Sequence, residues 1–362
     1  MTMSSSLRVV VVDDSPICRG LLKEILEADG DVTVVAEAAD GYAAISVART
    51  VAPDLITMDL DMPGPGGLEV IESIMARSPV PILVITDAPL GEGGELVFKA
   101  IEQGALDLMR KPSGTNVAAG KELRDRVRAL ARVPVFRHVP RQTSTLPPPA
   151  GSMTHKATVA PPPSGRPRAQ IVGIAAGPGG SRALTAVLSQ LPADLPAAVA
   201  VVQHVPSGFN EALVRFLRGS TSLRVEVAPD TAVPCTPGTV FVAPDDRHLV
   251  CPREGYIVAL HESALGGYLP SATMLFKSMS AAYRDACAGV ILSGAGDDGA
   301  EGATILRSRG GLTIAEDNHA SPADMPRAAV DAGGIDRVLP LALIADTLLS
   351  AIDGMLDRRP TP

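Results

Sequence analysis

The sequence predicts two α/β units, each built on a parallel sheet covered by helices, joined by a proline-rich linker. Short apolar runs alternate with amphipathic helical stretches in both halves of the chain, an order typical of parallel sheets. Residues 131–168 hold two PPP runs, several Arg and Lys, and no acidic residue, which favours an extended spacer without a core. With 362 residues and 46% apolar residues, the chain is long enough to fill two cores.

The first unit is expected over residues 7–130, with a flavodoxin-like (βα)5 order. Apolar runs predict strands at residues 7–12, 32–38, 55–60, 81–86 and 105–110. Each run is followed by a turn and a stretch with the apolar spacing of a helix, so the strands should lie parallel with helices on both faces.

The second unit is expected over residues 169–356 as a doubly wound parallel sheet. Apolar runs predict its main strands at residues 170–176, 197–204, 223–228, 239–244, 289–294 and 312–316. A short pair at 247–251 and 256–260 has no helical stretch between its members. It predicts an antiparallel insertion around residues 240–260.

Composition and charge exclude several classes of function. A net charge of −8 without a basic stripe argues against nucleic acid as a partner. No apolar stretch approaches the roughly 18–20 residues of a membrane span, and the N-terminus lacks the pattern of a signal peptide. The four cysteines are scattered, so we expect them reduced and not arranged as a zinc site. A cytoplasmic protein without direct membrane insertion is expected.

Polar residues follow the predicted strands of the first unit. Asp13 and Asp14 follow the first strand, Asp59 ends the third, Thr86 ends the fourth, and Lys111 follows the fifth. Because the carboxyl ends of parallel strands share one edge of a sheet, these side chains should converge. Crowded carboxylates with room for water favour Mg²⁺, and a carboxylate beside Mg²⁺, a hydroxyl and a lysine is suited to accept a phosphoryl group.

The segments VVVDDSP, LITMDLDMPGPGGLEV, VITDAP and LMRKPSG resemble, in order, the four signatures of response-regulator receiver domains. The resemblance implies that a partner histidine kinase phosphorylates Asp59. It also implies that Asp13, Asp14, Asp59 and the carbonyl of Asp61 hold Mg²⁺, while Thr86 and Lys111 contact the phosphoryl group. Receivers usually carry a switching Phe or Tyr three residues before that lysine. This chain has Leu108 there, so transmission of the phosphorylation signal is expected to be altered.

Two acid–base candidates end strands of the second unit. His204 follows the apolar run at 197–203, and Asp297 and Asp298 follow the run at 289–294. The first strand breaks in the turn Gly177-Pro178-Gly179-Gly180, which leads directly into a helical stretch. A histidine that faces an aspartate near such a turn is the arrangement of nucleophilic hydrolases, in which imidazole takes the nucleophile's proton.

The segments IVGIAAGPGGSRAL, VVQHVPSGFN, FVAPDDRHL and VILSGAGDDGAEGA resemble, in order, motifs of the chemotaxis protein-glutamate methylesterases, the CheB family. The resemblance implies hydrolysis of glutamyl methyl esters, and deamidation of certain glutamines, on the cytoplasmic domains of methyl-accepting chemoreceptors. It makes His204 the general base and Asp298 its orienting carboxylate, with an oxyanion hole near Ala295-Gly296. Phosphorylation of the receiver would relieve its block of this site.

The family's nucleophilic serine does not carry over, because Gly177 occupies that position. Leu269 and Thr273 also replace the family's usual Arg and Asp in the segment that contacts substrate. Ser181, Ser207 and Ser293 are candidate substitutes for the serine, although positioned catalysis tolerates little displacement. The turn matches no dinucleotide pattern, and its Gly and Pro are suited to preserving a tight turn, with Pro178 fitting a first helical turn.

Two hypotheses follow. The chain is an impaired methylesterase, or it is a non-catalytic, phosphorylation-controlled binding module that docks on receptors or on the kinase.

Overall fold

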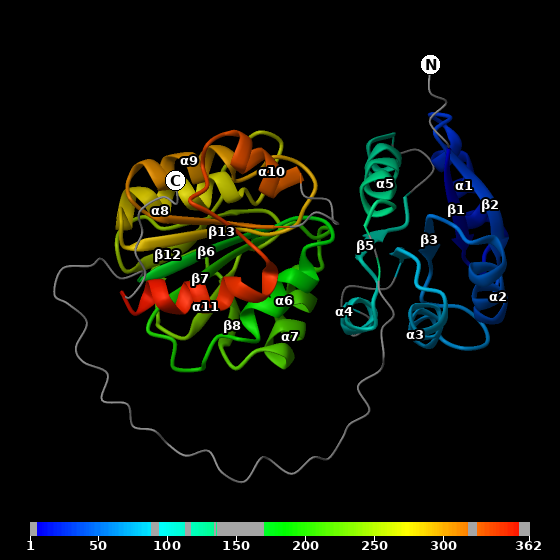
Figure 1. Ribbon diagram of the computed structural model, residues 1–362, viewed down its shortest axis with the longest axis horizontal. Coiled ribbons are helices and arrows are strands. Elements are labelled where there is room, and N and C mark those ends of the chain that lie inside the picture. Colours follow the sequence, from blue (N-terminus) through cyan, green and yellow to red (C-terminus); the bar gives the residue numbers. More distant parts are fainter. Residues whose placement is uncertain are drawn as a thin grey trace, which may run out of the picture.

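The computed structural model describes residues 6–87, 94–112, 117–133, 135, 170–317 and 324–354, which form two α/β units (Figure 1). Most of the proline-rich segment at 131–168 lies outside the described residues. The boundaries of the two units and the linker therefore stay predictions. Within the described residues, no helix has both the length and the apolar character needed to cross a membrane.

The first unit is a parallel five-stranded sheet with the strand order β2-β1-β3-β4-β5, as the alternation of strands and helices predicts. Its strands are β1 (Leu7–Val12), β2 (Val32–Ala38), β3 (Leu55–Met58), β4 (Ile82–Thr86) and β5 (Asp107–Arg110). Its helices are α1 (Pro16–Glu27), α2 (Gly41–Val51), α3 (Gly67–Arg77), α4 (Gly94–Glu102) and α5 (Val117–Leu130).

Helices cover both faces of this sheet. On one face, α1 and α5 pack through Leu22, Leu26, Leu123 and Val127 against the strands. On the other face, α2, α3 and α4 pack on the alternate strand residues such as Val10, Ile56 and Val84. Because both faces are covered, strands read as continuous apolar runs, and β3 and β4 are buried throughout.

The second unit is a parallel seven-stranded sheet with the order β15-β14-β13-β6-β7-β10-β8. Its strands are β6 (Ile171–Ala176), β7 (Ala198–Gln203), β8 (Arg224–Val227), β10 (Thr239–Val242), β13 (Cys287–Ile291), β14 (Leu312–Glu316) and β15 (Arg337–Leu339). Its helices are α6 (Ser181–Leu188), α7 (Asn210–Ser220), α8 (Ala272–Tyr283), α9 (Ala300–Ser308), α10 (Asp324–Asp331) and α11 (Leu341–Ile352). Residues of α8, α9 and α10 share one apolar cluster, and residues of α6, α7 and α11 belong to another.

An antiparallel sheet is present, but its extent differs from the predicted 240–260. It consists of β11 (His248–Val250), β12 (Tyr256–Leu260) and β9 (Val233–Pro234). Val240 instead lies in β10, which pairs in parallel with β7 and β8. The buried run at 239–242 therefore belongs to the main sheet, in agreement with the main strand predicted at 239–244, while β9 joins the antiparallel sheet from before residue 240.

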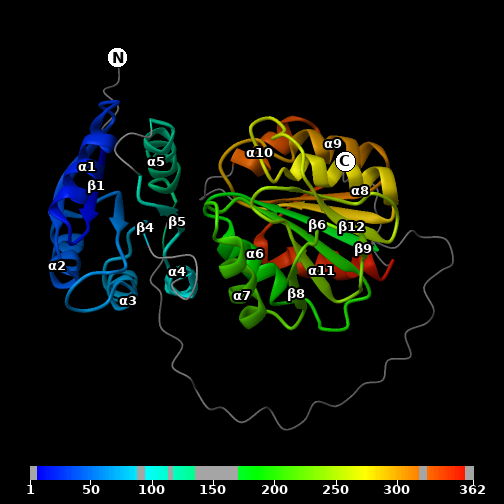
Figure 2. The ribbon, with the colours of Figure 1, turned by 180° about the vertical axis from the view of Figure 1, so that it is seen from behind.

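The two units contact each other through α4 of the first and through α6 and α7 of the second. Both ribbon views show α4, α5 and β5 on the side of the first unit that faces the second (Figures 1 and 2). The rings of Phe98 on α4 and Phe216 on α7 stack with their centroids 5.2 Å apart. One apolar cluster runs across this contact. Lys111 at the carboxyl edge of the first sheet lines the same cavity as His204, so this edge lies beside the second unit.

Candidate functional site

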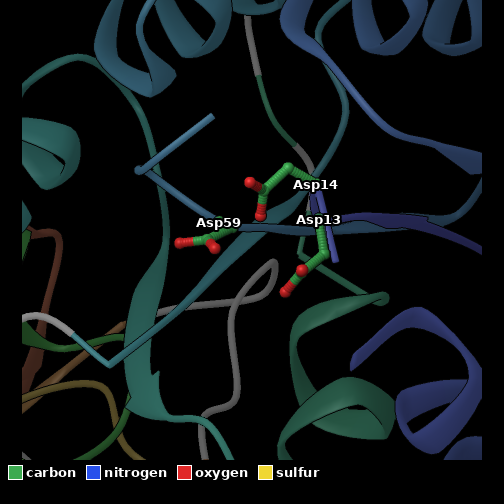
Figure 3. Close-up of side chains that lie close together, drawn as sticks. All are labelled: Asp13, Asp14 and Asp59. Atoms are coloured by element: carbon green, nitrogen blue, oxygen red, sulfur yellow. The ribbon is translucent and has the colours of Figure 1, made fainter. Parts of the chain in front are cut away.

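Three carboxylates converge at the carboxyl edge of the first sheet, as predicted from their places at strand ends. Asp13 and Asp14 follow β1, and Asp59 follows the neighbouring strand β3. One ligand atom from each of the three carboxylates lies within 4.8 Å of the other two (Figure 3). Asp13 and Asp59 are buried, and Asp14 is exposed.

Lys111 binds two of these carboxylates. Its Nζ lies 2.8 Å from Oδ2 of Asp13 and 2.6 Å from Oδ2 of Asp59. Burial alone would lower the pKa of the Lys111 ammonium, but hydrogen bonds to the two carboxylates outweigh burial and raise it. Burial raises the pKa of the Asp59 carboxyl, and Lys111 opposes this only in part.

The remaining predicted residues of this edge lie close by. Thr86 is fully buried at the end of β4, the strand beside β3. The backbone N–H of Asp61 donates to Oδ1 of Asp59 over 3.3 Å. The three carboxylates carry more negative charge than the single ammonium of Lys111 can neutralise, and Asp14 is open to water. Such a set of oxygen ligands fits a hard divalent cation. The acidic cluster is typical of a Mg²⁺ site.

At the edge of the second sheet, His204 and Asp298 meet as the sequence predicts. The histidine follows β7 and the aspartate follows β13, two strands that flank β6. Nε2 of His204 lies 3.1 Å from Oδ2 of Asp298. Asp298 is only 3% exposed, so the imidazole of His204 contacts a carboxylate that is almost completely excluded from water.

Asp298 is held by the N-terminus of α8. Its carboxylate accepts hydrogen bonds from Oγ of Ser271 at 2.9 Å, N of Ala272 at 2.7 Å and N of Thr273 at 3.0 Å. Burial alone would raise the pKa of this carboxyl, but His204 and the backbone N–H groups outweigh burial and lower it. Asp298 therefore stays ionised and fixes the imidazole.

Sequence reasoning missed Ser271 and the hydrogen bonds that Thr273 makes. Ser271 caps α8, and a serine before an apolar helical stretch is a sequence signal for a helix start that would have found it. Thr273 was considered only as a lost substrate contact. In the structure its hydroxyl also accepts a hydrogen bond from the N–H of Gly299 at 2.9 Å, so it helps to hold the loop after Asp298.

Tyr268 is a second residue that sequence reasoning missed. Its ring stacks on His204, with centroids 5.2 Å apart and planes 13° from parallel. Its hydroxyl donates to Oδ1 of Asp297 at 3.1 Å, which fixes the ring over the imidazole. The tyrosine lines two cavities of about 690 Å³ each, one containing Asp297 and Asp298 and the other containing His204. No local pattern in the sequence indicates this contact.

The glycine-rich turn lies beside the histidine. The N–H of His204 donates to the carbonyl of Ala176, and Nε2 of Gln203 donates to the carbonyl of Gly177. That same carbonyl accepts from the N–H of Gly180 at 2.9 Å, and Gly179 has a φ of +83°. With Pro178 at the second position, these features are those of a type II turn. Helix α6 starts only at Ser181, so Pro178 lies in the turn and not in the first helical turn.

The turn leaves no room for a side chain at residue 177. A Cβ placed there would lie 2.8 Å from Cα of Gly294 and 2.8 Å from Sδ of Met325. The N–H of Gly177 also donates to the carbonyl of Ser293 at 3.1 Å, which ties the turn to the segment after β13. A larger residue would therefore have to move backbone and not only a flexible side chain.

The three candidate substitute serines have different surroundings. Ser293 is buried, and its hydroxyl donates to Oε2 of Glu316 at 2.6 Å. Burial raises the pKa of the Glu316 carboxyl, and the bonds from Ser293 oppose this. Ser181 is buried in the first turn of α6, whereas Ser207 is exposed and shares a cavity with His204. A role for any of them as nucleophile stays untested.

Residues of both units line the cavity that holds His204, which measures about 690 Å³. Arg110 at the end of β5 lies over the ring of Phe209, with its guanidinium carbon 5.6 Å from the centroid.

Leu108, three residues before Lys111, is a buried residue of β5 and belongs to the apolar cluster that contains α4. On the same strand, Asp107 forms a buried ion pair with Arg126 at 2.6 Å and interacts with the backbone N–H of Gly179.

Comparison with known families gives two matches in the order of the two units. Residues 9–121 match the response regulator receiver domain, and residues 172–348 match the CheB methylesterase.

Curated proteins match along the whole chain. A protein-glutamate methylesterase/protein-glutamine glutaminase of Myxococcus xanthus is 40% identical over 96% of this chain and 98% of its own length. One from Anaeromyxobacter dehalogenans is 40% identical over 94% of this chain and 98% of its own length. Among solved structures, the catalytic domain of Thermotoga maritima CheB methylesterase is 30% identical, with 50% of this chain and 98% of that chain covered and a TM-score of 0.47.

Proposed function

Because this chain belongs to the CheB family of receiver-regulated protein-glutamate methylesterases/glutaminases, we propose that it is a phosphorylation-controlled chemotaxis response regulator whose esterase activity is impaired. Its partners are a chemotaxis histidine kinase and the cytoplasmic domains of methyl-accepting chemoreceptors, whose glutamyl methyl esters and glutamines are the family's substrates. The protein acts in the cytoplasm.

In the first unit, Asp59 is the phosphoacceptor. An oxygen of its carboxylate attacks phosphorus, and the bond between phosphorus and the donor breaks, which leaves an aspartyl phosphate. Lys111 lies 2.6 Å from Asp59 and is placed to pair with the new phosphoryl oxygens, with Thr86 as a hydroxyl contact. Asp13, Asp14, Asp59 and the carbonyl of Asp61 would hold Mg²⁺, which supplies neutralisation of the charge that develops during transfer.

In the second unit, the contact between His204 and Asp298 supports a role for His204 as the general base. Asp298 is ionised and accepts from four donors, His204 among them, and so holds the imidazole in one orientation. Such a base removes the proton of a nucleophilic hydroxyl as that oxygen attacks the ester carbonyl. The N–H groups around Ala295-Gly296 would bind the resulting oxyanion.

The observation that carries the proposal of impairment is the assembled His204–Asp298 pair beside a turn in which residue 177 has no side chain. Without a hydroxyl at that position, no acyl-enzyme forms there. In a comparable serine hydrolase, loss of the nucleophile lowers kcat on the order of 10⁶-fold. The residual activity would be too low for turnover of receptor methyl groups.

Methanol release from a methylated receptor cytoplasmic fragment tests this proposal. The full-length protein, treated with acetyl phosphate and Mg²⁺, should release no methanol above a buffer control, while an active family member under the same conditions serves as the positive control. Robust release by this protein would overturn the impairment.

The second candidate function is a binding module that docks on receptors or kinase without chemistry. Two contacts between the units favour it, Phe98–Phe216 and Arg110–Phe209. Through them, phosphorylation of the first unit can act on the second unit even if the second unit catalyses no reaction. Phosphorylation of Asp59 would loosen this contact and expose the face around His204. Binding of receptor fragments that depends on phosphorylation, without methanol release, is the expected result.

A further inference from the structure

The strand β5 presents its side chains alternately to two different neighbours. Met109 packs in the cluster formed with α1 and α5, whereas Leu108 packs in the cluster that contains α4 and continues into the second unit. Successive side chains of an extended strand point to opposite faces, so Arg110 shares the face of Leu108 and Lys111 shares that of Met109. Arg110 and Lys111 are neighbours in the chain, but their charged groups contact different partners, Phe209 for the arginine and two carboxylates for the lysine.

Lys111 faces the phosphoacceptor. It holds Asp13 and Asp59 at 2.8 and 2.6 Å, so any change in charge at Asp59 acts first on this ammonium. A phosphoryl group adds about 1.5 to 2 negative charges and three acceptor oxygens, which gives Lys111 new partners at new positions. The backbone N–H of Lys111 donates to the carbonyl of Thr86 at 3.3 Å, so β5 and β4 respond together at their ends.

Arg110 faces the second unit. Its guanidinium lies over the ring of Phe209, which directly precedes α7 and follows His204 by five residues. It also adds a favourable charge interaction with Asp245. The carboxylate of Asp245 accepts from the N–H of Gly208 at 2.6 Å and from Nδ2 of Asn210 at 2.5 Å. Arg110 thus contacts Phe209 within the 205–210 segment, which leads from His204 into α7, and its charge favours the ionised form of Asp245, which holds the same segment.

We infer that Arg110 is the residue that couples the phosphorylation state of Asp59 to the segment carrying His204. The inference rests on the proposed phosphorylation of Asp59. Leu108, at the position of the usual aromatic switch, is apolar and 1% exposed, so it offers no group that a phosphoryl charge would attract. Arg110 lies two residues further on the same face, carries a permanent charge, and adjoins the lysine that binds Asp59.

The coupling follows from charge and geometry. In the unphosphorylated state, Arg110 holds Phe209 through a cation–π contact that depends on its position at the end of β5, and its charge also acts on Asp245. When Lys111 binds the phosphoryl group, the end of β5 moves with it. The guanidinium of Arg110 then no longer lies over the ring of Phe209. The 205–210 segment and His204 are then released from the first unit.

Hydrogen–deuterium exchange of the full-length protein tests this inference, with the 204–211 segment as the readout and acetyl phosphate with Mg²⁺ as the phosphodonor. In the wild type, phosphorylation should speed exchange in this segment. Arg110→Ala should show roughly two- to fivefold faster exchange there before phosphorylation, the factor that corresponds to loss of a partly exposed cation–π contact. Phosphorylation of this variant should add little more. Arg110→Lys should fall between the wild type and Arg110→Ala, because lysine keeps the charge that acts on Asp245 but loses the planar guanidinium that stacks on Phe209.

Arg49→Ala is the matched control, since Arg49 is an exposed arginine on α2 of the same unit. It should leave both the basal exchange and the response unchanged. Labelling of Asp59 should be equal in all these variants, which separates failure of the coupling from failure of the proposed phosphorylation. An Arg110→Ala variant with wild-type exchange and wild-type response would overturn the inference. So would a wild-type protein that is labelled at Asp59 without any change in the 204–211 segment.

Discussion

Gly177 and Gly294 lie so close together that a Cβ on either would meet the backbone of the other at less than 3.0 Å. From Gly177 the built Cβ lies 2.8 Å from Cα of Gly294, and from Gly294 it lies 2.5 Å from N of Gly177. Real Cβ atoms essentially never show such distances. The turn at the position expected for a nucleophile is therefore shaped around the absence of a side chain, and restoring one must displace the segment after β13.

This close approach determines the outcome of restoring the serine. Gly177→Ser should regain some methanol release over the wild type, but with lower thermal stability, because the hydroxyl enters only when the 293–296 segment moves. Gly177→Ser combined with Pro178→Thr should regain more, since loss of the proline relaxes the type II turn. Methanol release and melting temperature of the isolated variants measure both effects.

Adding His204→Ala to the double variant is the control, and it should remove the recovered activity. Strong wild-type release that Ser181→Ala abolishes would instead establish a relocated nucleophile. No recovery in the double variant would mean that Leu269, Thr273 or other changes have also removed the substrate site.

The second prediction concerns the phosphoacceptor. Asp59→Asn should abolish labelling by acetyl phosphate, because an amide cannot attack phosphorus and Asp59 is the one carboxylate of the described cluster that follows β3, the central strand of the sheet. Chelation of Mg²⁺ should have the same effect, since the charge that develops on the phosphoryl group is then not neutralised. Asp61→Asn is the matched control and should be labelled, because it keeps the backbone carbonyl. Undiminished labelling of Asp59→Asn would place the phosphoacceptor elsewhere.

The third prediction concerns receptor binding. Phosphorylation of Asp59 should change the affinity for receptor cytoplasmic fragments by about 1–3 kcal/mol, the usual size of coupling between two sites. Titration of a labelled fragment with the phosphorylated protein and with Asp59→Asn measures the difference. Equal affinities would remove the regulatory role of the first unit.

The fourth prediction concerns the buried ion pair between Asp107 and Arg126. Both side chains are almost entirely excluded from water, and Arg126 also donates to Glu122 and to the carbonyl of Leu108. Arg126→Met should lower the free energy of unfolding by about 3–5 kcal/mol, because Asp107 is left as an uncompensated buried charge. Denaturant titration measures this loss.

Lys121→Ala serves as the comparison for the ion pair. Lys121 pairs with Asp125 on the exposed face of the same helix, so its loss should cost less than about 1 kcal/mol. Asp107→Leu in the Arg126→Met background should recover part of the stability, since the unpaired charge is then gone. A cost as small as that of Lys121→Ala would show that water reaches Asp107.

Much of both sites could be predicted from the sequence because each predicted residue ends a strand. Parallel strands bring their carboxyl ends to one edge, so Asp13, Asp59 and Lys111 converge once the βα alternation is recognised. The same rule brings His204 and Asp298 to one edge of the second sheet. The glycine-rich turn can also be predicted locally, because Pro178 at its second position and Gly179 at its third are the residues that a type II turn favours.

Other features depend on contacts between segments far apart in the sequence. The antiparallel sheet differs from the predicted range 240–260 at its start, because Val240 pairs with β7 and β8 while β9, which lies before residue 240, pairs with β12, and only long-range pairing decides this. Ser271 has a local signal as a helix cap, but its contact with Asp298, the stacking of Tyr268 on His204 and the approach of Gly294 to Gly177 have none.

The sequence by itself determined which residues end each strand. Because parallel strands have their carboxyl ends at one edge of the sheet, it also determined which side chains lie together at that edge. Only the tertiary structure decided how tightly residue 177 is enclosed and which first-unit residue contacts the His204 segment. Both depend on packing between elements far apart in the chain, such as Arg110 of β5 against Phe209 and Gly177 against Gly294. Distances of that kind follow from the fit of whole surfaces and not from any local pattern.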